Sequence, residues 1–327
     1  MTMRAPPERA AALAAAAALA FGAGAVGVTH AAFSGGTANA ANSITAAPDF
    51  RPPVVSPLAI AKTSGGAAGY LAPGGIYRVY AKVTESGNPP SGVASVTANL
   101  SAITAGQTAV QVSPGSFTVD GVTYNYRSGL LNADAGLASG SQPFTVTATD
   151  AAANSATASG SVVIDATRPF AADVQAANSG GGPIRNVGPG DSFTLTYSEP
   201  IEPGSLLSGW TGATTTVNVR LKNGGAGNDG DRLEIWNAAQ SAPVQLGSIA
   251  LGRHDYLNGQ PVWFFPGTMT MSGSTITIVI GGTVSAPDTA TGSATMVWDP
   301  STAAIDLAGN ALLGNLATES GPLDSDF

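Results

Sequence analysis

Phe144-Thr-Val-Thr-Ala-Thr-Asp150-Ala-Ala-Ala-Asn154-Ser-Ala-Thr-Ala-Ser-Gly-Ser-Val-Val-Ile-Asp165 is the part of the sequence that says most about the fold. Its first third alternates Phe144, Val146 and Ala148 with threonines. Strict alternation places every second side chain on the same face of an extended chain. The stretch therefore predicts a β-strand with one buried face.

The same alternation recurs through most of the chain after residue 50. It is present at Tyr77–Val83, Phe193–Tyr197, Val217–Leu221, Leu233–Ile235 and Ile276–Ile280. Between Phe117 and Tyr124 two such runs are joined by Asp120-Gly121, a pair that tolerates positive φ at both turn positions of a tight hairpin. No segment after the N-terminal region shows an apolar stripe with helical spacing. We therefore predict an all-β protein.

Two pairs of segments repeat each other at long range. The run Pro73–Ala81 resembles Pro189–Tyr197, 116 residues later, because each is a Pro-Gly turn followed by an alternating strand. Asp150-Ala-Ala-Ala-Asn154 resembles Asp306-Leu-Ala-Gly-Asn310, 156 residues later. Two copies of one layout explain both repeats. The larger second offset predicts that the second copy carries about 40 extra residues, within 205–270.

Proline-rich segments separate the copies. They are Arg51-Pro52-Pro53 and Thr167-Arg168-Pro169, where proline cannot donate to a strand ladder. We expect a first domain at 51–166 and a larger second domain, with an insertion, at 168–327.

Both copies resemble bacterial Ig-like domains of secreted proteins. In the first, Phe144–Asp165 is similar to the penultimate and last strands of such a module, with Ala-Ala-Asn in place of the usual Ala-Gly-Asn turn. In the second, the resemblance rests on Leu195–Ile201 and Ile305–Asn310. The resemblance implies two tandem Ig-like β-sandwich domains. Such a fold does not identify a ligand.

The N-terminal region has the features of an export signal. Arg4 and Arg9 precede nineteen uncharged residues, 10–28, eleven of which are alanine. A charged start, an apolar stretch and a small-residue site predict a cleaved signal peptide at 1–32, with no membrane span left after cleavage. An uncleaved membrane anchor is the alternative.

The region after the apolar stretch, 31–50, resembles the signature of the TasA/camelysin type, which a SipW-class peptidase cuts before a phenylalanine. Ala47-Pro48-Asp49-Phe50 departs from that family's usual ending. The resemblance implies cleavage between Ala32 and Phe33 and an extracellular or cell-surface location. No His-Glu-x-x-His motif is present, so a metalloprotease activity is not expected. Residues 33–50 are expected to form a flexible segment, and strand addition by this segment to a neighbouring copy is one route to self-association.

Composition excludes several classes of function. The chain has 13 Lys and Arg against 21 Asp and Glu, for a net charge of −8, so we do not expect it to bind nucleic acid. It has no cysteine, which excludes disulfides, thiol catalysis and Cys-ligated metals. The only histidines are His30 and His254, and His30 lies within the expected signal peptide.

Catalytic candidates are few. A Ser-His-Asp triad would have to use His254, which we interpret as an exposed loop residue because no Gly-x-Ser-x-Gly motif accompanies it. Glu199 and Glu202 could in principle form a glycosidase acid pair, but they flank Pro200 at a strand end, and we interpret them as solvated turn residues. We therefore expect no enzyme activity and no catalytic residues.

Two groups of acidic and amide residues are calcium candidates. Gly225-Ala-Gly-Asn-Asp-Gly230 matches a dinucleotide motif formally, but a strand follows it, so we interpret it as a hairpin loop. This loop offers Asn228, Asp229 and Asp231 as oxygen ligands. Asp150 and Asp165, near the ends of the first domain, are a second candidate group, of an inter-domain kind. Asp and Asn are also ordinary turn residues, so no cofactor is required.

All four tryptophans lie in the second domain. Trp236 and Trp298 follow alternating or apolar runs and are predicted to lie in the core. Trp210 and Trp263 are candidate ligand-binding residues, because exposed rings can stack on sugars or on another protein. The sequence thus favours a secreted, non-catalytic surface or matrix protein that mediates adhesion or assembly, with an extracellular protein or polysaccharide as its partner. A carbohydrate-binding adhesin is the first alternative, and a hydrolase that uses His254 is a remote one.

Overall fold

The computed structural model describes residues 49–63, 67–179, 183–224 and 230–321. The expected signal peptide, its cleavage site and the segment 33–48 lie outside the described residues. Within them the protein is all-β, as predicted, and the one helix is the single turn α2 (Pro203–Leu206). No helix in this described part is long and apolar enough to cross a bilayer.

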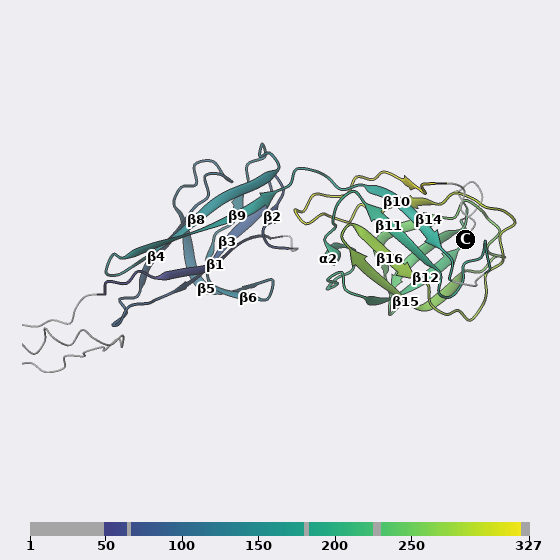
Figure 1. The fold of residues 1–327 in the computed structure, drawn as a ribbon, viewed down its shortest axis with the longest axis horizontal. Coiled ribbons are helices and arrows are strands. Elements are labelled where there is room, and N and C mark those ends of the chain that lie inside the picture. Colours follow the sequence, from purple (N-terminus) through teal and green to yellow (C-terminus); the bar gives the residue numbers. More distant parts are fainter. Residues whose placement is uncertain (1–48, 64–66, 180–182, 225–229, 322–327) are drawn as a thin grey trace, which may run out of the picture. The chain divides into compact units, whose positions relative to one another are not determined.

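The strands fall into two sheets with no pairing between them (Figure 1). The first contains β1 (Val54–Lys62), β2 (Tyr70–Leu71), β3 (Ile76–Thr84), β4 (Val93–Asn99), β5 (Val110–Val119), β6 (Val122–Ser128), β7 (Leu131–Asn132), β8 (Gly140–Asp150) and β9 (Ser155–Ile164). The second contains β10 (Ala171–Ala177), β11 (Ser192–Tyr197), β12 (Thr215–Lys222), β13 (Arg232–Asn237), β14 (Pro243–Ala250), β15 (Val262–Ser272), β16 (Thr275–Val279), β17 (Val297–Asp299) and β18 (Ala317–Thr318).

The first sheet has the order β1-β3-β6-β5-β4-β8-β9-β2, with β7 beside β3. Strand β5 belongs to two layers, because its start pairs with β4 and the rest pairs with β6 across a bulge between Pro114 and Phe117. The sheet therefore turns over at β5, and one apolar core draws side chains from β3 on one side and from β4, β8 and β9 on the other. We describe this part as the first β-body.

The alternating stretch quoted at the outset forms the β8–β9 hairpin. Phe144, Val146 and Ala148 are buried, as predicted. Phe144 lies opposite Gly160, where an added Cβ would come within 2.6 Å of the ring. The glycine thus leaves the space that the phenylalanine ring occupies. At the β5–β6 turn, Asp120 and Gly121 both have positive φ, 47° and 76°, as the hairpin prediction required.

The second sheet has the order β10-β11-β16-β15-β12-β13-β14-β17-β18. Its two outer strands are joined by side chains. Asn315 exchanges hydrogen bonds with the backbone N and O of Ala171 (3.3 and 2.8 Å), and the Ser320 amide donates to Asp173 (3.0 Å). These contacts close the sheet into a barrel-like second β-body and cover its edges.

The core of the second β-body is largely aliphatic and includes several buried aromatic rings. Trp298 is fully buried, as predicted; its Nε1 donates to the Leu246 carbonyl (2.7 Å), and its ring packs edge-on against Tyr197 at 4.9 Å. Trp210, a candidate ligand-binding residue from the sequence, is a core residue instead, with 8% of its surface exposed and its Nε1 bonded to the Ala213 carbonyl (2.6 Å). It follows α2 in a loop whose sequence has no periodicity to reveal its burial.

Candidate cation-binding sites

The turn after β8 is held by its own side chains. Asn154 donates from its backbone N to Asp150 Oδ1 (2.8 Å) and from Nδ2 to Asp150 Oδ2 (2.9 Å). The same Nδ2 also donates to the backbone oxygen of Asp49 (2.9 Å), which lies just before β1. The turn therefore fixes the segment that leads into the first β-body.

The second copy of this turn repeats the contacts atom for atom. Asn310 donates from its backbone N to Asp306 Oδ1 (2.8 Å), and from Nδ2 to Asp306 Oδ2 (2.8 Å) and to the backbone oxygen of Asp165 (2.9 Å). Asp165 lies in the segment that leads into the second β-body, as Asp49 does in the first. The sequence repeat is thus also a structural repeat.

Each turn brings together three carboxylates. In the first trio, Asp49, Glu85 and Asp150 each offer an oxygen, and these oxygens lie within 4.8 Å of one another. Glu85 directly follows β3.

In the second trio, Asp165, Glu199 and Asp306 meet within the same 4.8 Å limit, and Glu199 follows β11. Both trios combine an aspartate from the leading segment, a glutamate from the end of an equivalent strand and the aspartate of the turn. We call these the first trio and the second trio.

Three of the six trio residues, Asp49, Asp150 and Asp306, are buried, and the other three are half-buried. Asp150 and Asp306 are 2% and 1% exposed. One carboxylate oxygen in each trio, Glu85 Oε2 and Glu199 Oε1, is buried and accepts no hydrogen bond from an amide or hydroxyl group of the described residues. Burial of a carboxylate oxygen without a partner destabilises the folded chain by about 1–3 kcal/mol or more. A bound cation would give this oxygen a partner in each trio.

The pKa values of the trio residues show how their negative charges are held together. The pKa of Glu199 is raised to about 7, first by burial and then by the negative charges of Asp165 and Asp306. The pKa of Asp49 is lowered, chiefly by the hydrogen bond from the Arg51 amide. Calcium binds six to eight oxygen ligands, and clustered carboxylates supply both the oxygens and the compensating charge. The residues of each trio fit a divalent cation of this kind.

These positions revise one sequence-based grouping. Asp150 and Asp165 were expected to form one candidate site, but each belongs to a different trio. Glu199 was expected to be a solvated turn residue, and this is wrong for its buried Oε1.

Sequence reasoning also missed Asp49, Glu85 and Asp306 as candidate ligands. A signal was present, because Asp49 and Asp165 are separated by the same 116 residues as the two Pro-Gly turns.

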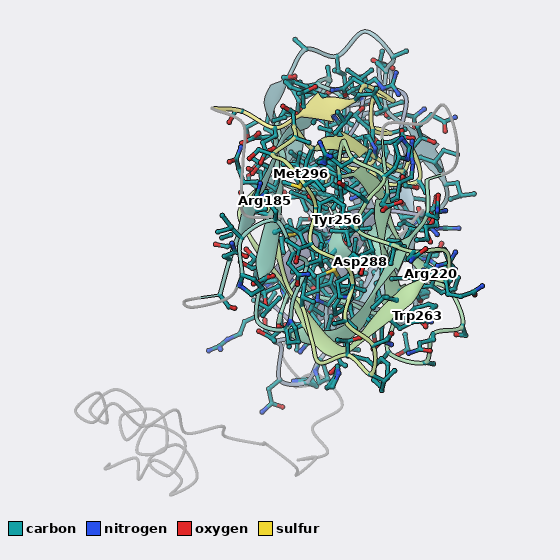
Figure 2. All side chains as sticks on the ribbon, turned by 90° about the vertical axis from the view of Figure 1, so that its right-hand side faces the viewer. Arg185, Arg220, Tyr256, Trp263, Asp288 and Met296 are labelled. Carbon is teal, nitrogen blue, oxygen red and sulfur yellow. The ribbon has the colours of Figure 1, made fainter. Side chains whose placement is uncertain are left out.

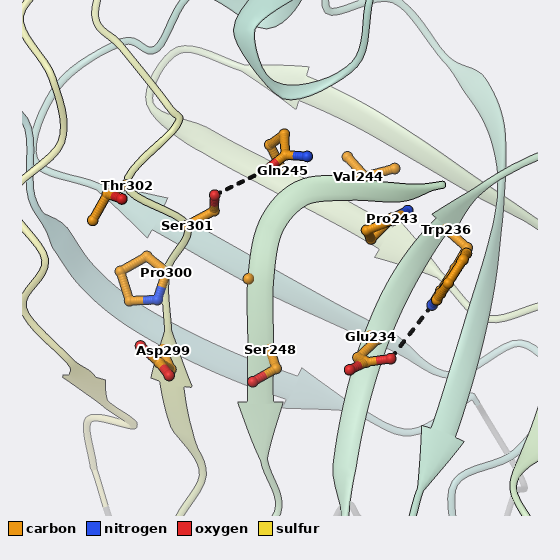
Figure 3. A pocket seen from close by; sticks show the side chains of 11 residues that line it. Glu234, Trp236, Pro243, Val244, Gln245, Ser248, Asp299, Pro300, Ser301 and Thr302 are labelled. Carbon is orange, nitrogen blue, oxygen red and sulfur yellow. Dashed lines mark hydrogen bonds between the residues drawn. The ribbon is translucent and has the colours of Figure 1, made fainter. Parts of the chain in front are cut away.

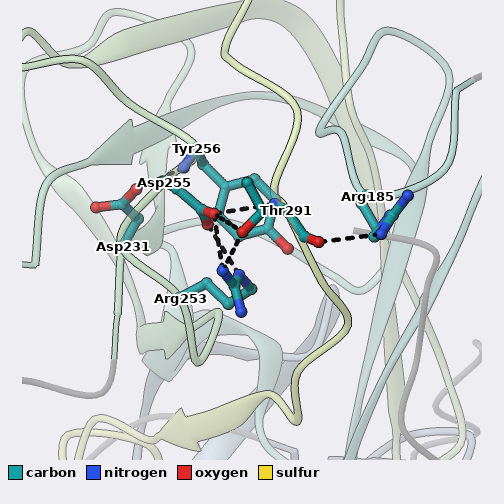
Figure 4. A network of polar contacts seen from close by, with 6 residues as sticks. All are labelled: Arg185, Asp231, Arg253, Asp255, Tyr256 and Thr291. Carbon is teal, nitrogen blue, oxygen red and sulfur yellow. Dashed lines mark hydrogen bonds and ion pairs between the residues drawn. The ribbon is translucent and has the colours of Figure 1, made fainter.

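Of the other calcium candidates, only Asp231 lies among the described residues, and its carboxylate has a different role. Asn228 and Asp229 lie outside the described residues. Asp231 is fully buried, and its carboxylate accepts hydrogen bonds from the backbone N of Tyr256 (3.1 Å) and of Gly224 (3.4 Å) (Figure 4). Burial raises its pKa, against the lowering effect of these amides. Its oxygens therefore fix the surrounding loops.

His254 is exposed on one of these loops. The adjacent Asp255 carboxylate is bound by the Arg253 guanidinium (2.8 and 2.9 Å) and by the Thr291 amide and hydroxyl (2.9 and 2.7 Å) (Figure 4). These contacts hold the pKa of Asp255 far below its usual range. Asp255 is thus a stabilising anion for the loop at residue 291.

The half-exposed tryptophans lie on the outer face of the second β-body. Trp263, on β15, lies beside Arg220 at one side of this body (Figure 2). Trp236 packs edge-on against Trp263, with ring centroids 5.6 Å apart. The expectation that Trp236 is a core residue is therefore wrong, whereas Trp263 stays a candidate for ligand contact.

Comparison with known proteins adds no assignment. No family model matches the chain, and no curated protein matches it.

Proposed function

We propose that this chain is a secreted, non-catalytic protein of the cell surface or extracellular matrix whose two β-bodies are stiffened by calcium. The observation that carries the proposal is the repetition of one carboxylate trio, with the same asparagine contacts, at the leading segment of each body. A cation in a trio would tie the incoming chain to the end of a core strand. It would thereby fix how each body is joined to the segment before it.

The expected export signal is consistent with calcium sites of this kind, because an exported protein meets the high calcium concentration outside the cell. Extracellular calcium-binding modules bind at about 10⁻⁴–10⁻³ M, so such sites fill outside the cell. Ig-like identity and adhesion or assembly are part of the same proposal, as is cleavage between Ala32 and Phe33. N-terminal sequencing of secreted protein tests the cleavage: a start at Phe33 supports it, and a start at Met1 contradicts it.

Calcium titration by calorimetry tests the cation sites directly. We expect two calcium ions per chain, one for Asp306→Asn, one for Asp150→Asn and none for the double variant. Asp299→Asn, which removes an exposed carboxylate outside both trios, should keep two and serves as the control. Unchanged stoichiometry in the double variant would contradict the proposal.

Calcium should also raise thermal stability if it binds only the folded chain. At 100 times the dissociation constant, one site contributes about 2.7 kcal/mol. The rise in Tm with calcium should therefore be present in the original chain and in the Asp299→Asn control and lost in the double variant.

Carbohydrate binding is the second candidate function, and a pocket beside Trp236 favours it. A hydrolase that uses His254 is not proposed, because Asp255, the adjacent carboxylate, is paired with Arg253 and Thr291.

A further inference from the structure

The outer face of the second β-body carries a pocket that the cation sites do not explain (Figure 3). Glu234 and Trp236 on β13 line one side, β14 lies between, and Asp299–Thr302, at and after the end of β17, line the other side. Its volume is about 470 Å³. Pockets of about 300–1,000 Å³ are typical of sites for small ligands.

The pairing of strands β15, β12, β13, β14 and β17 forms the side of the second β-body that carries the pocket. Cross-strand pairs run in one row from Trp263 on β15 through Arg220, Glu234 and Ser248 to Asp299 on β17. We call these five residues the outer row. Inward-facing neighbours such as Leu221, Leu233 and Ile249 are fully buried. The outer row is therefore displayed by strands whose other face is anchored in the core, which is the rigid support that a binding site requires.

Trp236 is fixed at the wall of the pocket. Its Nε1 donates to Glu234 Oε2 (3.4 Å), and the Arg220 guanidinium lies 5.5 Å from its ring centre. With Trp263 packed edge-on, the indole is held in one orientation. A partly exposed indole of fixed orientation is an apolar surface on which the C–H face of a sugar ring can pack.

The charges around the pocket disfavour an anionic ligand. Glu234 pairs with both Arg220 (3.6 Å) and Lys222, so its one negative charge is shared between two cations. Among the described residues that line the pocket, Glu234 and Asp299 are acidic and none is basic. A carboxylated or sulfated ligand would meet two carboxylates and no cation among the residues that line the pocket. Arg232 donates to the lining Ser248 hydroxyl (3.0 Å) but is not itself a lining residue.

The remaining polar groups suit hydroxyls. Gln245 accepts a hydrogen bond from the Ser301 hydroxyl (3.1 Å), and the exposed Thr302 hydroxyl lines the same wall. Amide, hydroxyl and carboxylate groups can together accept from, and donate to, several sugar hydroxyls. We propose that this pocket binds a neutral saccharide, with Trp236 as the stacking residue and Asp299, Gln245 and Thr302 as hydroxyl partners. The proposal does not depend on the cation sites.

Affinity electrophoresis of the full chain tests the proposal. The gels contain dextran, galactomannan or mixed-linkage β-glucan as neutral probes, and alginate or hyaluronan as acidic ones. We expect retardation by at least one neutral probe and by neither acidic probe. Trp236→Ala should weaken that binding at least tenfold. Phe170→Ala, which removes an aromatic ring that is 43% exposed and does not line the pocket, should leave it unchanged.

Two measures keep the test independent of folding. Near-UV circular dichroism shows whether Trp236→Ala keeps its packed core, and Thr302→Arg adds a bulky side chain to the pocket from an exposed position outside the strands. We expect Thr302→Arg to weaken binding as well. Retardation by no neutral probe, retardation by the acidic probes alone, or unchanged binding in both folded variants would overturn the proposal.

Discussion

Asn154 and Asn310, 156 positions apart, make the same three hydrogen bonds to the turn aspartate and to the aspartate that precedes the β-body. Backbone contacts agree as well, because the amides of Asp150 and Asp306 donate to the carbonyl oxygens of Asn154 and Asn310 (3.0 and 3.1 Å). Such a network positions two of the three carboxylates of each trio. Its role is therefore open to test by removing the amide alone.

Replacing Asn310 with alanine should weaken the second β-body and its cation site. Loss of the amide leaves oxygens of Asp306 and Asp165 without their donor, at a cost of about 1–3 kcal/mol. Urea denaturation should show this loss, and calcium titration should show weaker binding at one of two sites. Asn258→Ala, at an exposed position, should change stability by less than about 0.5 kcal/mol. Equal stability of the two variants would show that the amide does not hold the turn.

Stability without calcium should fall as the pH rises. In the folded chain the pKa of Glu199 is about 7, above its ordinary value of 4.5, so the folded state keeps a proton that the unfolded state releases between these values. Protonation therefore favours folding below about pH 4.5, and this contribution is lost as the pH rises to 7. The loss should be on the order of 1 kcal/mol, because Glu199 is partly exposed and solvent screens its charge.

Denaturation midpoints in a chelating buffer between pH 4.5 and 7.5 measure this slope. Glu199→Gln should flatten it, and saturating calcium should flatten it in the original chain. A slope that is the same in Glu199→Gln would assign the pH dependence to other groups.

Local patterns in the sequence were sufficient for the strands and insufficient for the sites. Alternation at Val217–Leu221 and Leu233–Ile235 gave the buried face of β12 and β13 correctly. The same alternation places Trp236 on the outer face, and the core assignment was wrong because it relied on Trp236 ending an alternating run and did not follow the phase of that run. Phase is a backbone property and applies to every residue of a strand, whatever its hydrophobicity.

The trios could not be found by local reasoning. Glu85 and Glu199 lie at strand ends and approach their partners only after the sheets form, so no spacing in the sequence reveals them. Only the repeated offset of 116 residues connects Asp49 with Asp165. Convergence of three distant segments is a property of the topology, which alternation does not specify.

Gly247 should be intolerant of alanine. Its φ is +81°, and an added Cβ would lie 2.0 Å from the backbone oxygen of Asp299, on the neighbouring strand β17. Alanine would therefore add backbone strain to a clash with a strand that cannot move freely, for a loss of about 2–4 kcal/mol. Gly259→Ala is the matched control, because its φ is also positive (+105°) but nothing lies within 4 Å. Urea denaturation should show a clearly larger loss for Gly247→Ala, and similar losses would mean that the clash is relieved.

Whether the second β-body binds calcium when produced alone should depend on the residue at which the fragment begins. The sequence-based boundary places the second domain at 168–327, which leaves out Asp165, whereas the structure includes Asp165 in the second trio. A fragment covering 165–327 should bind one calcium ion. A fragment covering 168–327 should bind far more weakly, because it retains only Glu199 and Asp306. Both should fold cooperatively, since every strand of the second sheet lies within 171–318.

Calorimetry of the two fragments, with circular dichroism melts as the folding control, makes the comparison. Equal calcium binding by the two folded fragments would remove Asp165 from the site and, with it, the proposed link between the cation and the leading segment.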